Sequence, residues 1–435
     1  MTLESILLAL NEPDFADGLR PTWEPSMQTF PQGTRPHLLD PAVIGISREL
    51  CGLGDEADKP LRAAADRIAG DPALCRLFWN INWQVFDSGH SLFNNTTAKL
   101  SAWPQLTASL GDQAGLFYLL GALDFAPRLR AYHRLLKIPE TVTRETCQQI
   151  RCFCGNYQQA RGGKLGVFPN QYRWLRNYVR DNIYVRLGRL EFWARPYGGG
   201  LTVFRHRHSK ATVALAEEGS CFNVEGYMDE PEHQQARGPN WTATLRITPD
   251  AVRGYPINPW GKAVRQEIEL TSADWERVLT RDDPVYDLHI PSGGNMGLDK
   301  VVDALRRAHQ FFRAQFPSRT GVAVVCGSWI FSPLLEDVLG PDANVVRFAR
   351  EVYLHPNSVT GPEALWFIFL QDKFDLATAP RATSIQRALA DYLSQGRLWR
   401  NGTMFFLMDD LERLGTQHYR AQWPAIQKLI SCALR

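Results

Sequence analysis

The sequence lacks any apolar run long enough to cross a lipid bilayer, which requires about 20 residues; GLFYLLGAL and LWFIFL are far shorter. It also lacks an excess of one charge, because 48 Lys and Arg stand against 46 Asp and Glu. A formal net charge of +2 gives no global attraction to nucleic acid or to an anionic membrane. The first ten residues, MTLESILLAL, lack the basic region of a secretory signal, so we expect a cytoplasmic protein.

Cysteine pairs with the spacing of metal ligands are missing as well. Eight Cys are scattered along the chain, and in CQQIRCFC the thiols of Cys147, Cys152 and Cys154 do not follow C-x-x-C spacing. On a helix, Cys147 and Cys154 would share one face, which is typical of core residues. We therefore expect reduced thiols and no metal, with a zinc site at this cluster as the alternative.

The residues that are present predict a large core divided between domains. Hydrophobic residues make up 44% of the 435 residues, and Trp and Phe number 13 and 22, which is enough for two or three domains. Residues 1–185 carry apolar residues at three- and four-residue spacing, for example in DKPLRAAADRIAGD and ALCRLFWNINWQVF. This periodicity predicts a mainly helical N-terminal domain.

The pattern changes to alternation at about Arg189. LEFWARPYGGGLTVFRHR reads as a hairpin, and ATVALA, CFNVEGYM, WTATLRI and QEIEL read as further short strands. TSADWERVL resembles a capped helix, with Thr271 or Ser272 as the N-cap. Residues 186–375 are therefore predicted to form a domain that begins with antiparallel strands.

From Pro284 the predicted order is regular. The strand VYDLHI is followed by a glycine turn, by a helix from about Asp299 to Phe316, and by the buried strand GVAVVCGSW. SPLLEDVLG predicts a short helix, NVVRFAREVYLHP and ALWFIFLQD predict two more strands, and residues 376–435 predict a helical C-terminal extension. The whole reads as an α/β (α+β) fold, with a helical N-terminal domain before a mixed sheet flanked by helices.

The order of these elements and two stretches of the sequence resemble a known family. Antiparallel strands, then strand, glycine turn, helix, strand, helix and strand, is the order of the GNAT acyltransferase fold. The stretches YRWLRNYVRDNIYVRLGRLEFWARPY and GVAVVCGSWIFSPLLEDVLGPDANVVRFAREV resemble bacterial acyltransferase-domain proteins, which join a helical N-acyltransferase-type domain to a GNAT-like C-terminal domain. The resemblance is best between about Ala131 and Asp372. It implies transfer of an acyl group from acyl-CoA to a small-molecule amine by direct attack.

The resemblance also implies where CoA binds. The co-substrate would lie where two central strands splay apart, with VYDLHI pairing with the pantetheine amides. The turn after this strand would offer backbone N–H groups to the pyrophosphate at a helix N-terminus. The residues predicted to bind acyl-CoA are Ile290, Ser292, Gly293, Gly294, Asn295 and Gly297. The usual Gln/Arg-x-x-Gly-x-Gly/Ala loop fits this turn poorly and Asp299 adds a negative charge, so a plain strand-to-helix turn is the alternative.

The catalytic candidates lie at the ends of the two predicted strands. In VYDLHI, alternation places Asp287 and His289 on one face, where the carboxylate would raise the pKa of the His289 imidazole and fix its tautomer. His289 is the candidate base, and a structural histidine is the alternative reading. On the next strand, Cys326 and Ser328 share a face and are candidates to donate to the leaving sulfur or to line the acyl pocket. A buried, inert thiol is the alternative for Cys326.

Two other functions are compatible with the sequence. The poor loop match, together with the absence of a Tyr from SPLLEDVLG, favours a GNAT-shaped binding or scaffold protein without transfer chemistry. His206 and His208 lie on one face of a predicted strand, which allows a metal-dependent hydrolase, although no third ligand can be named. The sequence leaves the acceptor, the acyl length and the oligomeric state open.

Overall fold

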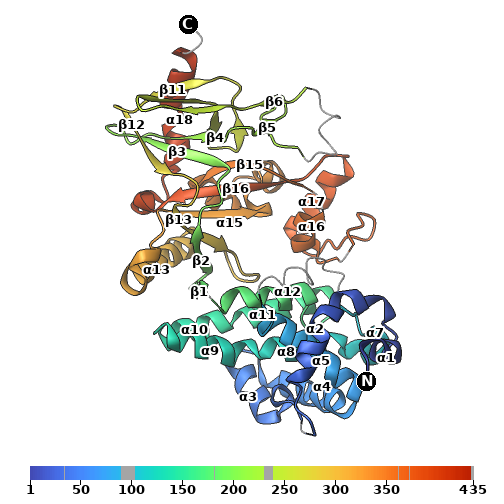
Figure 1. Ribbon diagram of the computed structural model, residues 1–435. Helices are drawn as coiled ribbons and strands as arrows, with labels where there is room; N and C mark the ends of the chain where they lie inside the picture. Colours follow the sequence, from blue (N-terminus) through green and yellow to red (C-terminus); the bar gives the residue numbers. More distant parts are fainter. Residues whose placement is uncertain are drawn as a thin grey trace. The chain divides into compact units, whose positions relative to one another are not determined.

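The computed structural model of the chain describes residues 1–33, 35–89, 103–180, 182–229, 239–360, 362–371 and 373–432 (Figure 1). The chain divides into two compact units: Met1–Leu187 with Pro291–Gly293, and Gly188–Ile290 with Gly294–Arg435. In the ranges just given, no helix is both long enough and apolar enough to cross a bilayer.

The first unit is built of helices. Their capping residues and their apolar faces show where they begin and which of them lie in the core. Asp71 starts α5 by accepting hydrogen bonds from the N–H groups of Ala73 and Leu74, with Pro72 in the first turn. Every residue of α8 is buried, so it forms the centre of this unit. The elements are α1 (Leu3–Ala9), α2 (Ala16–Gln28), α3 (Pro41–Leu50), α4 (Asp58–Gly70), α5 (Pro72–Phe86), α7 (Thr107–Leu110), α8 (Ala114–Leu123), α9 (Phe125–Leu135), α10 (Glu140–Cys147), α11 (Gln149–Ala160), α12 (Pro169–Trp174) and β1 (Ile183–Leu187).

The second unit is organised around a mixed sheet. The strands that this unit contributes to it are, in spatial order, β2 (Leu190–Pro196), β13 (Pro284–His289), β14 (Ala323–Ser328), β16 (Arg400–Leu407) and β15 (Tyr353–Thr360). The pairing of β13 with β14 is parallel, and the other pairings in this order are antiparallel. A parallel pair in the middle of the sheet requires a crossover, which the helix between β13 and β14 supplies.

Three smaller sheets account for the other strands among the described residues of this unit. A five-stranded antiparallel sheet has the order β10 (Lys262–Ala263), β9 (Pro256–Asn258), β4 (Thr212–Ala216), β3 (Leu201–His206) and β12 (Trp275–Leu279). A three-stranded sheet contains β11 (Ile268–Thr271), β8 (Ala251–Gly254) and β7 (Leu245–Ile247), and a two-stranded one contains β5 (Cys221–Phe222) and β6 (Trp241–Thr242).

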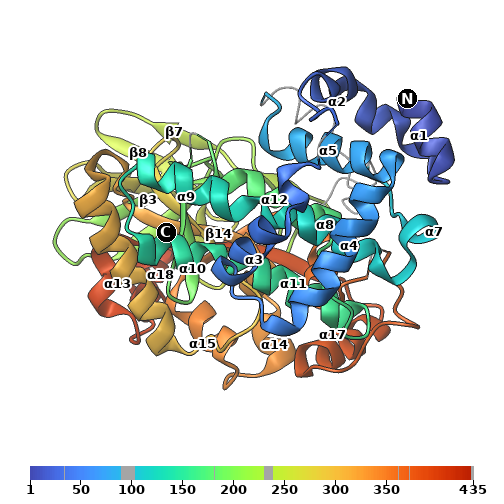
Figure 2. The same cartoon turned by 90° about the horizontal axis from the view of Figure 1, so that it is seen from below.

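The two faces of the mixed sheet have different neighbours. On one face, the ring of Tyr286 stacks on Phe312 of α13 (Leu298–Gln315), with ring centroids 4.5 Å apart. On the other face, Tyr353 stacks on Phe405, and its hydroxyl donates to the carbonyl of Ile257 in β9 of the five-stranded sheet. Figure 2 shows α13, α15 (Asn344–Glu351) and α14 (Leu335–Leu339) following one another along one side of the unit. The mixed sheet therefore has a helix face and a sheet face.

The observed elements confirm the predicted fold class, a helical N-terminal region followed by an α+β region. Three predicted segments differ in type. TSADWERVL contains strand β12, because Thr271 accepts from the N–H of Asp274 in a turn and starts no helix. NVVRFARE is helix α15, with β15 beginning only at Tyr353, and ALWFIFL falls in α16 (Pro362–Phe369).

Residues 376–435 also contain more than the predicted helices. The described part holds α17 (Ser384–Ser394) and α18 (His418–Cys432), as the sequence predicted, but also strand β16. Because β16 lies between β14 and β15, this part of the chain completes the mixed sheet. The short 3-10 segment MDDLER, η10 (Met408–Arg413), connects β16 with α18.

Two buried histidines predict that the protein loses stability in mild acid. Burial lowers the pKa of His133 and that of His355 to about 4. The unfolded chain protonates them near pH 6.5, so the stability they contribute is present above this value and is lost as the pH falls toward 4. Protonation of each histidine should lower the free energy of unfolding by up to about 3 kcal/mol over this pH range. Urea unfolding of the wild type and of His133→Gln and His355→Gln measures this; an equally steep pH dependence in the variants would contradict it.

Candidate active site

Strand β13 presents its residues alternately to the two faces of the mixed sheet. It pairs with β2 along its whole length, from Pro284 opposite Pro196 to His289 opposite Glu191. Since Tyr286 contacts α13, Leu288 lies on the same helix face, and Asp287 and His289 lie on the sheet face. The predicted grouping of Asp287 with His289 on one face is thus what the register gives.

Strands β13 and β14 are paired only over their first residues. The parallel register joins Val285 to Ala323, Tyr286 to Val324 and Asp287 to Val325, and then stops. Beyond this point, β13 stays with β2 as far as His289, and β14 stays with β16 as far as Ser328. The strands therefore part at their carboxyl ends, which leaves the facing edges of both without a strand partner in the described structure.

The turn that follows β13 contains two consecutive glycines in the left-handed region. Gly293 and Gly294 have φ values of 75° and 77°, a region that L-residues with a Cβ rarely adopt. Both glycines are exposed, and within the described ranges their N–H groups donate to no protein acceptor. Helix α13 begins at Leu298, directly after this turn, so its partial positive charge lies at the same end of the loop.

Two side chains that the sequence did not single out hold this loop. The Nε of Arg189 donates to the carbonyl of Asn295 at 3.3 Å, and the Nδ2 of Asn344 donates to the Oδ1 of Asn295 at 2.7 Å. Arg189 is distant from the loop in sequence and lies in the turn before β2, so no local pattern connects it with the glycines. The guanidinium adds a positive charge beside Gly294.

Ser292 is anchored within the first unit. Its hydroxyl donates to the carbonyl of Cys152 at 3.1 Å, although the side chain is exposed. Ile290 is half-buried at the end of β13, and Gly297 is the N-cap residue of α13 without a capping side chain. The exposed Asp299 carboxylate lies over Gly297, because a Cβ built there would come within 2.5 Å of its Oδ1.

The electrostatics of His289 differ from the expectation. Asp287 forms an ion pair with Arg195, and burial, opposed by this arginine, raises the pKa of the Asp287 carboxyl. Burial lowers the pKa of His289 to about 4, where a neighbouring carboxylate was expected to raise it. The imidazole is therefore neutral at physiological pH, and it is a weaker base than an exposed histidine.

Cys326 and Ser328 lie on the face opposite His289. Because Val325 pairs with Asp287 on the sheet face, alternation places Cys326 and Ser328 on the helix face. Burial raises the pKa of Cys326 well above its usual range, so the group is a thiol. Ser328 accepts a hydrogen bond from the N–H of Ile330 at 3.4 Å. The structure thus does not bring these two residues to the face of the candidate base.

The metal alternatives gain no support in the described residues, where no three His, Cys, Asp or Glu side chains gather as a metal site. His206 and His208 have ring centroids 6.0 Å apart, and the Nδ1 of His206 accepts from the backbone N–H groups of His208 and Ser209. Cys147 and Cys154 are buried, and burial raises the pKa of Cys147 to about 12, as for a core thiol.

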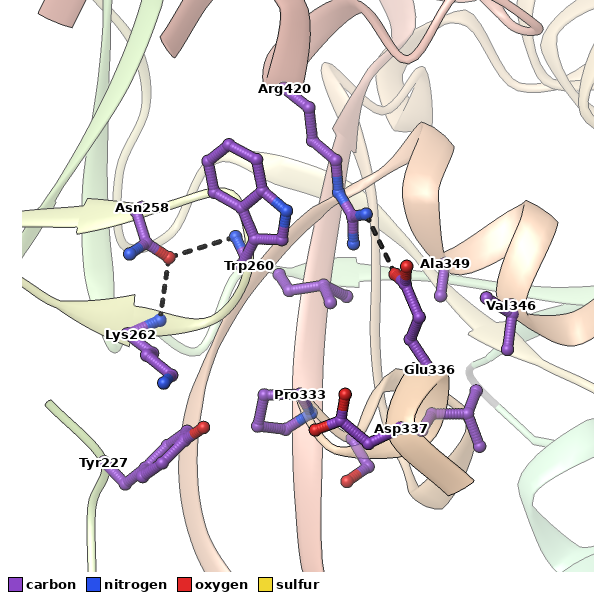
Figure 3. A pocket seen from close by; sticks show the side chains of 13 residues that line it. Tyr227, Asn258, Trp260, Lys262, Pro333, Glu336, Asp337, Val346, Ala349 and Arg420 are labelled. Atoms are coloured by element: carbon purple, nitrogen blue, oxygen red, sulfur yellow. Dashed lines mark hydrogen bonds and ion pairs between the residues drawn. The ribbon is translucent and has the colours of Figure 1, made fainter. Parts of the chain in front are cut away.

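A pocket of about 430 Å³ lies elsewhere in the second unit, between α14, α15, α18 and the β9–β10 turn (Figure 3). Glu336 on its wall accepts from Arg420 at 3.2 Å, and Trp260 lies under the same guanidinium, 5.5 Å from it. Lys262 points in from the opposite side (Figure 3). None of the candidate acyl-CoA or catalytic residues lines this pocket, which borders β15 and not the parted strands.

Comparison with known protein families accounts for this architecture. The model of the N-acyltransferase N-terminal domain matches residues 47–180, and that of the GNAT-like C-terminal domain matches residues 184–406, more than half of the chain. A comparison with curated proteins found no match.

Solved structures share the fold over nearly the whole chain. An acyltransferase in complex with decanoyl-CoA and teicoplanin is 20% identical, with a TM-score of 0.59 over 94% of this chain and 100% of that one. An acyltransferase mutant in complex with octanoyl-CoA is also 20% identical, with a TM-score of 0.58 over 94% and 99%. At this identity the likeness establishes the fold. With both domain models matched in order, the chain belongs to the family that joins an N-acyltransferase N-terminal domain to a GNAT-like C-terminal domain.

Proposed function

We propose that this protein transfers an acyl group from acyl-CoA to an amine by direct attack of the amine on the thioester. The observation that carries the proposal is the partial pairing of β13 and β14, which ends at Asp287 and Val325 beside an exposed glycine turn. Membership of the family supports the same activity.

The parted strands suit the pantetheine arm of CoA. Its two amides would pair with the edge of β13 beyond Asp287, where the pairing with β14 has ended, as an added strand does. The pyrophosphate would then reach the turn, where the N–H groups of Gly293 and Gly294 are available and Arg189 supplies a positive charge. The proposed acyl-CoA contacts are Ile290, Ser292, Gly293, Gly294, Asn295 and Gly297, together with Arg189.

The chemistry proposed for His289 is that of a general base. The amine nitrogen attacks the thioester carbonyl carbon, a C–N bond forms, and the nitrogen becomes positively charged. The neutral imidazole of His289 accepts a proton from this nitrogen, directly or through water. The C–S bond then breaks, and its electron pair goes to the sulfur. The products are the amide and the CoA thiolate.

The departing thiolate needs a hydrogen-bond donor and then a proton. It would leave at the level of the sheet, between the two strand ends, where groups from either face can approach it. We assign the donor role to Ser328 or Cys326, at the end of β14, with water as the proton source. Asp287 is proposed to fix the position of Arg195 through their ion pair on the sheet face, and not to activate His289.

The similarly folded acyltransferases guide the choice of substrates. They were crystallised with octanoyl-CoA, or with decanoyl-CoA and teicoplanin. We propose a medium-chain acyl-CoA as donor and an amine-bearing small molecule as acceptor, to be sought in a panel of amines with teicoplanin among them. Release of free CoA thiol that depends on the amine would identify the acceptor.

The first experiment is a calorimetric titration with CoA of the wild type and of the double variant Gly293→Ala, Gly294→Ala. The added methyl groups disfavour the left-handed backbone and crowd the N–H groups, so affinity for CoA should fall by about tenfold or more. Gly396→Ala is the matched control, since Gly396 has a φ of 71° and no atom within 4 Å of its built Cβ, as Gly293 does. Absence of CoA binding by the wild type would refute the proposal.

A further inference from the structure

Gly327 occupies a position in β14 that does not itself require glycine. It lies in the central part of the mixed sheet, paired with Thr403 of β16, yet it is exposed. Its φ is not positive, and a Cβ built on it would come no closer than 3.7 Å to the Nδ2 of Asn357 and 4.0 Å to the Oγ1 of Thr403. These are ordinary contacts, so an alanine would fit the free protein.

Glycine within a strand weakens the strand unless another group must approach its backbone closely. Gly327 lies two residues beyond Val325, the last residue of β14 that pairs with β13. It is therefore on the face of the sheet that carries Asp287 and His289, at the point where the strands have parted. Because Gly327 has no side chain, the space at its Cβ position is bordered within 4 Å only by Asn357 and Thr403 among the described residues, on the strand across the opening from His289.

The surroundings of this space fit an acyl thioester. The side chains of Thr403 and Asn357 border it with polar atoms, and the buried apolar side chains of Val325 and Phe405 lie next to it on the same face. A thioester carbonyl needs polar neighbours, while the carbons that follow it need an apolar wall. A side chain at position 327 would take the space of the first carbons of the acyl group.

We propose that Gly327 is a specificity-determining residue, whose bare backbone lets acyl groups longer than acetyl pass beside His289; this inference rests on the proposed acyltransferase function. The CoA part of the ligand lies at β13 and the glycine turn, away from Gly327. Enlarging residue 327 should therefore penalise the acyl group and spare CoA itself.

The test measures the dissociation constants of CoA, acetyl-CoA and octanoyl-CoA by calorimetry, without an acceptor, for the wild type and for Gly327→Ala, Gly327→Val and Gly327→Leu. Affinity for CoA should change by less than about twofold, and affinity for octanoyl-CoA should fall progressively, by about tenfold or more for Gly327→Leu. Gly198→Val is the control, because Gly198 is also exposed, has no positive φ and has an open Cβ position.

The outcomes separate this inference from the proposed function. If the wild type binds CoA and octanoyl-CoA but the Gly327 variants bind both as well as the wild type, Gly327 does not face the acyl group. If the variants lose CoA and octanoyl-CoA equally, the effect is not specific to the acyl group and the inference is overturned. If the wild type binds neither ligand, the proposed function fails and the inference with it. Should Gly327→Leu not fold, Gly327→Ala and Gly327→Val give the same comparison.

Discussion

Substitution of His289 by glutamine is expected to lower kcat for acyl transfer by about 10²–10⁴-fold, the usual contribution of a general base. The glutamine amide is close to imidazole in size and polarity, but it cannot accept the proton of the attacking amine. Affinity for CoA should change little, because the proposed CoA contacts are to the backbone of β13 and to the glycine turn. The measurement is release of the CoA thiol with a fixed amine acceptor.

The pH profile adds a test that a purely structural histidine would not meet. Since burial lowers the pKa of His289 to about 4, its basic form is present throughout the neutral range. Loss of rate as the pH falls toward 4 should therefore belong to His289 and disappear in the residual activity of the variant. His206→Gln, at the end of β3 in the other sheet, is the control. Equal rates for His289→Gln and the wild type would remove His289 from the mechanism.

The largest loss of stability is expected from Asp410→Ala. The Asp410 carboxylate is fully buried, pairs with the buried Arg205 of β3, and accepts from the Tyr419 hydroxyl at 3.0 Å. Removing the carboxylate leaves the Arg205 guanidinium charged in a site with little water. A buried charge without its counter-ion costs about 3–5 kcal/mol. Urea unfolding of the full-length protein measures this loss.

A double substitution distinguishes pairing from packing at this site. Asp410→Leu combined with Arg205→Met removes both charges and keeps apolar volume, so it should be far less destabilising than Asp410→Ala alone. Glu269→Ala is the surface control: it breaks an exposed pair with Arg253 and should cost less than about 1 kcal/mol. If Asp410→Ala were as mild as Glu269→Ala, the buried pair would not stabilise the junction of β3 with η10.

Alternation and helical spacing predicted the elements that form the site, but not every element around it. The strand Pro284–His289, the glycine turn and helix α13 follow directly from the sequence pattern. ALWFIFL was predicted as a strand because a short apolar run has no period that separates a buried strand from a buried helix. The β-branched pair in NVVRFARE favoured a strand, yet Val346 and Ala349, three residues apart, bury one helix face of α15.

The register between neighbouring strands could not be predicted from local sequence patterns. The sequence placed Cys326 with Ser328 and Asp287 with His289, but the register that puts the two pairs on opposite faces depends on pairing between distant segments. Arg189 and Asn344 reach Asn295 from far along the chain for the same reason. The lowered pKa of His289 follows from burial, which the sequence does not give at the level of one side chain.

A crystal structure of the protein with octanoyl-CoA would show directly whether acyl-CoA binds in the opening between β13 and β14. We expect the pyrophosphate within hydrogen-bond distance of the N–H groups of Gly293 and Gly294, and pantetheine amides paired with β13 beyond Asp287. Octanoyl-CoA bound at another place, with the edges of β13 and β14 left empty, would contradict this expectation.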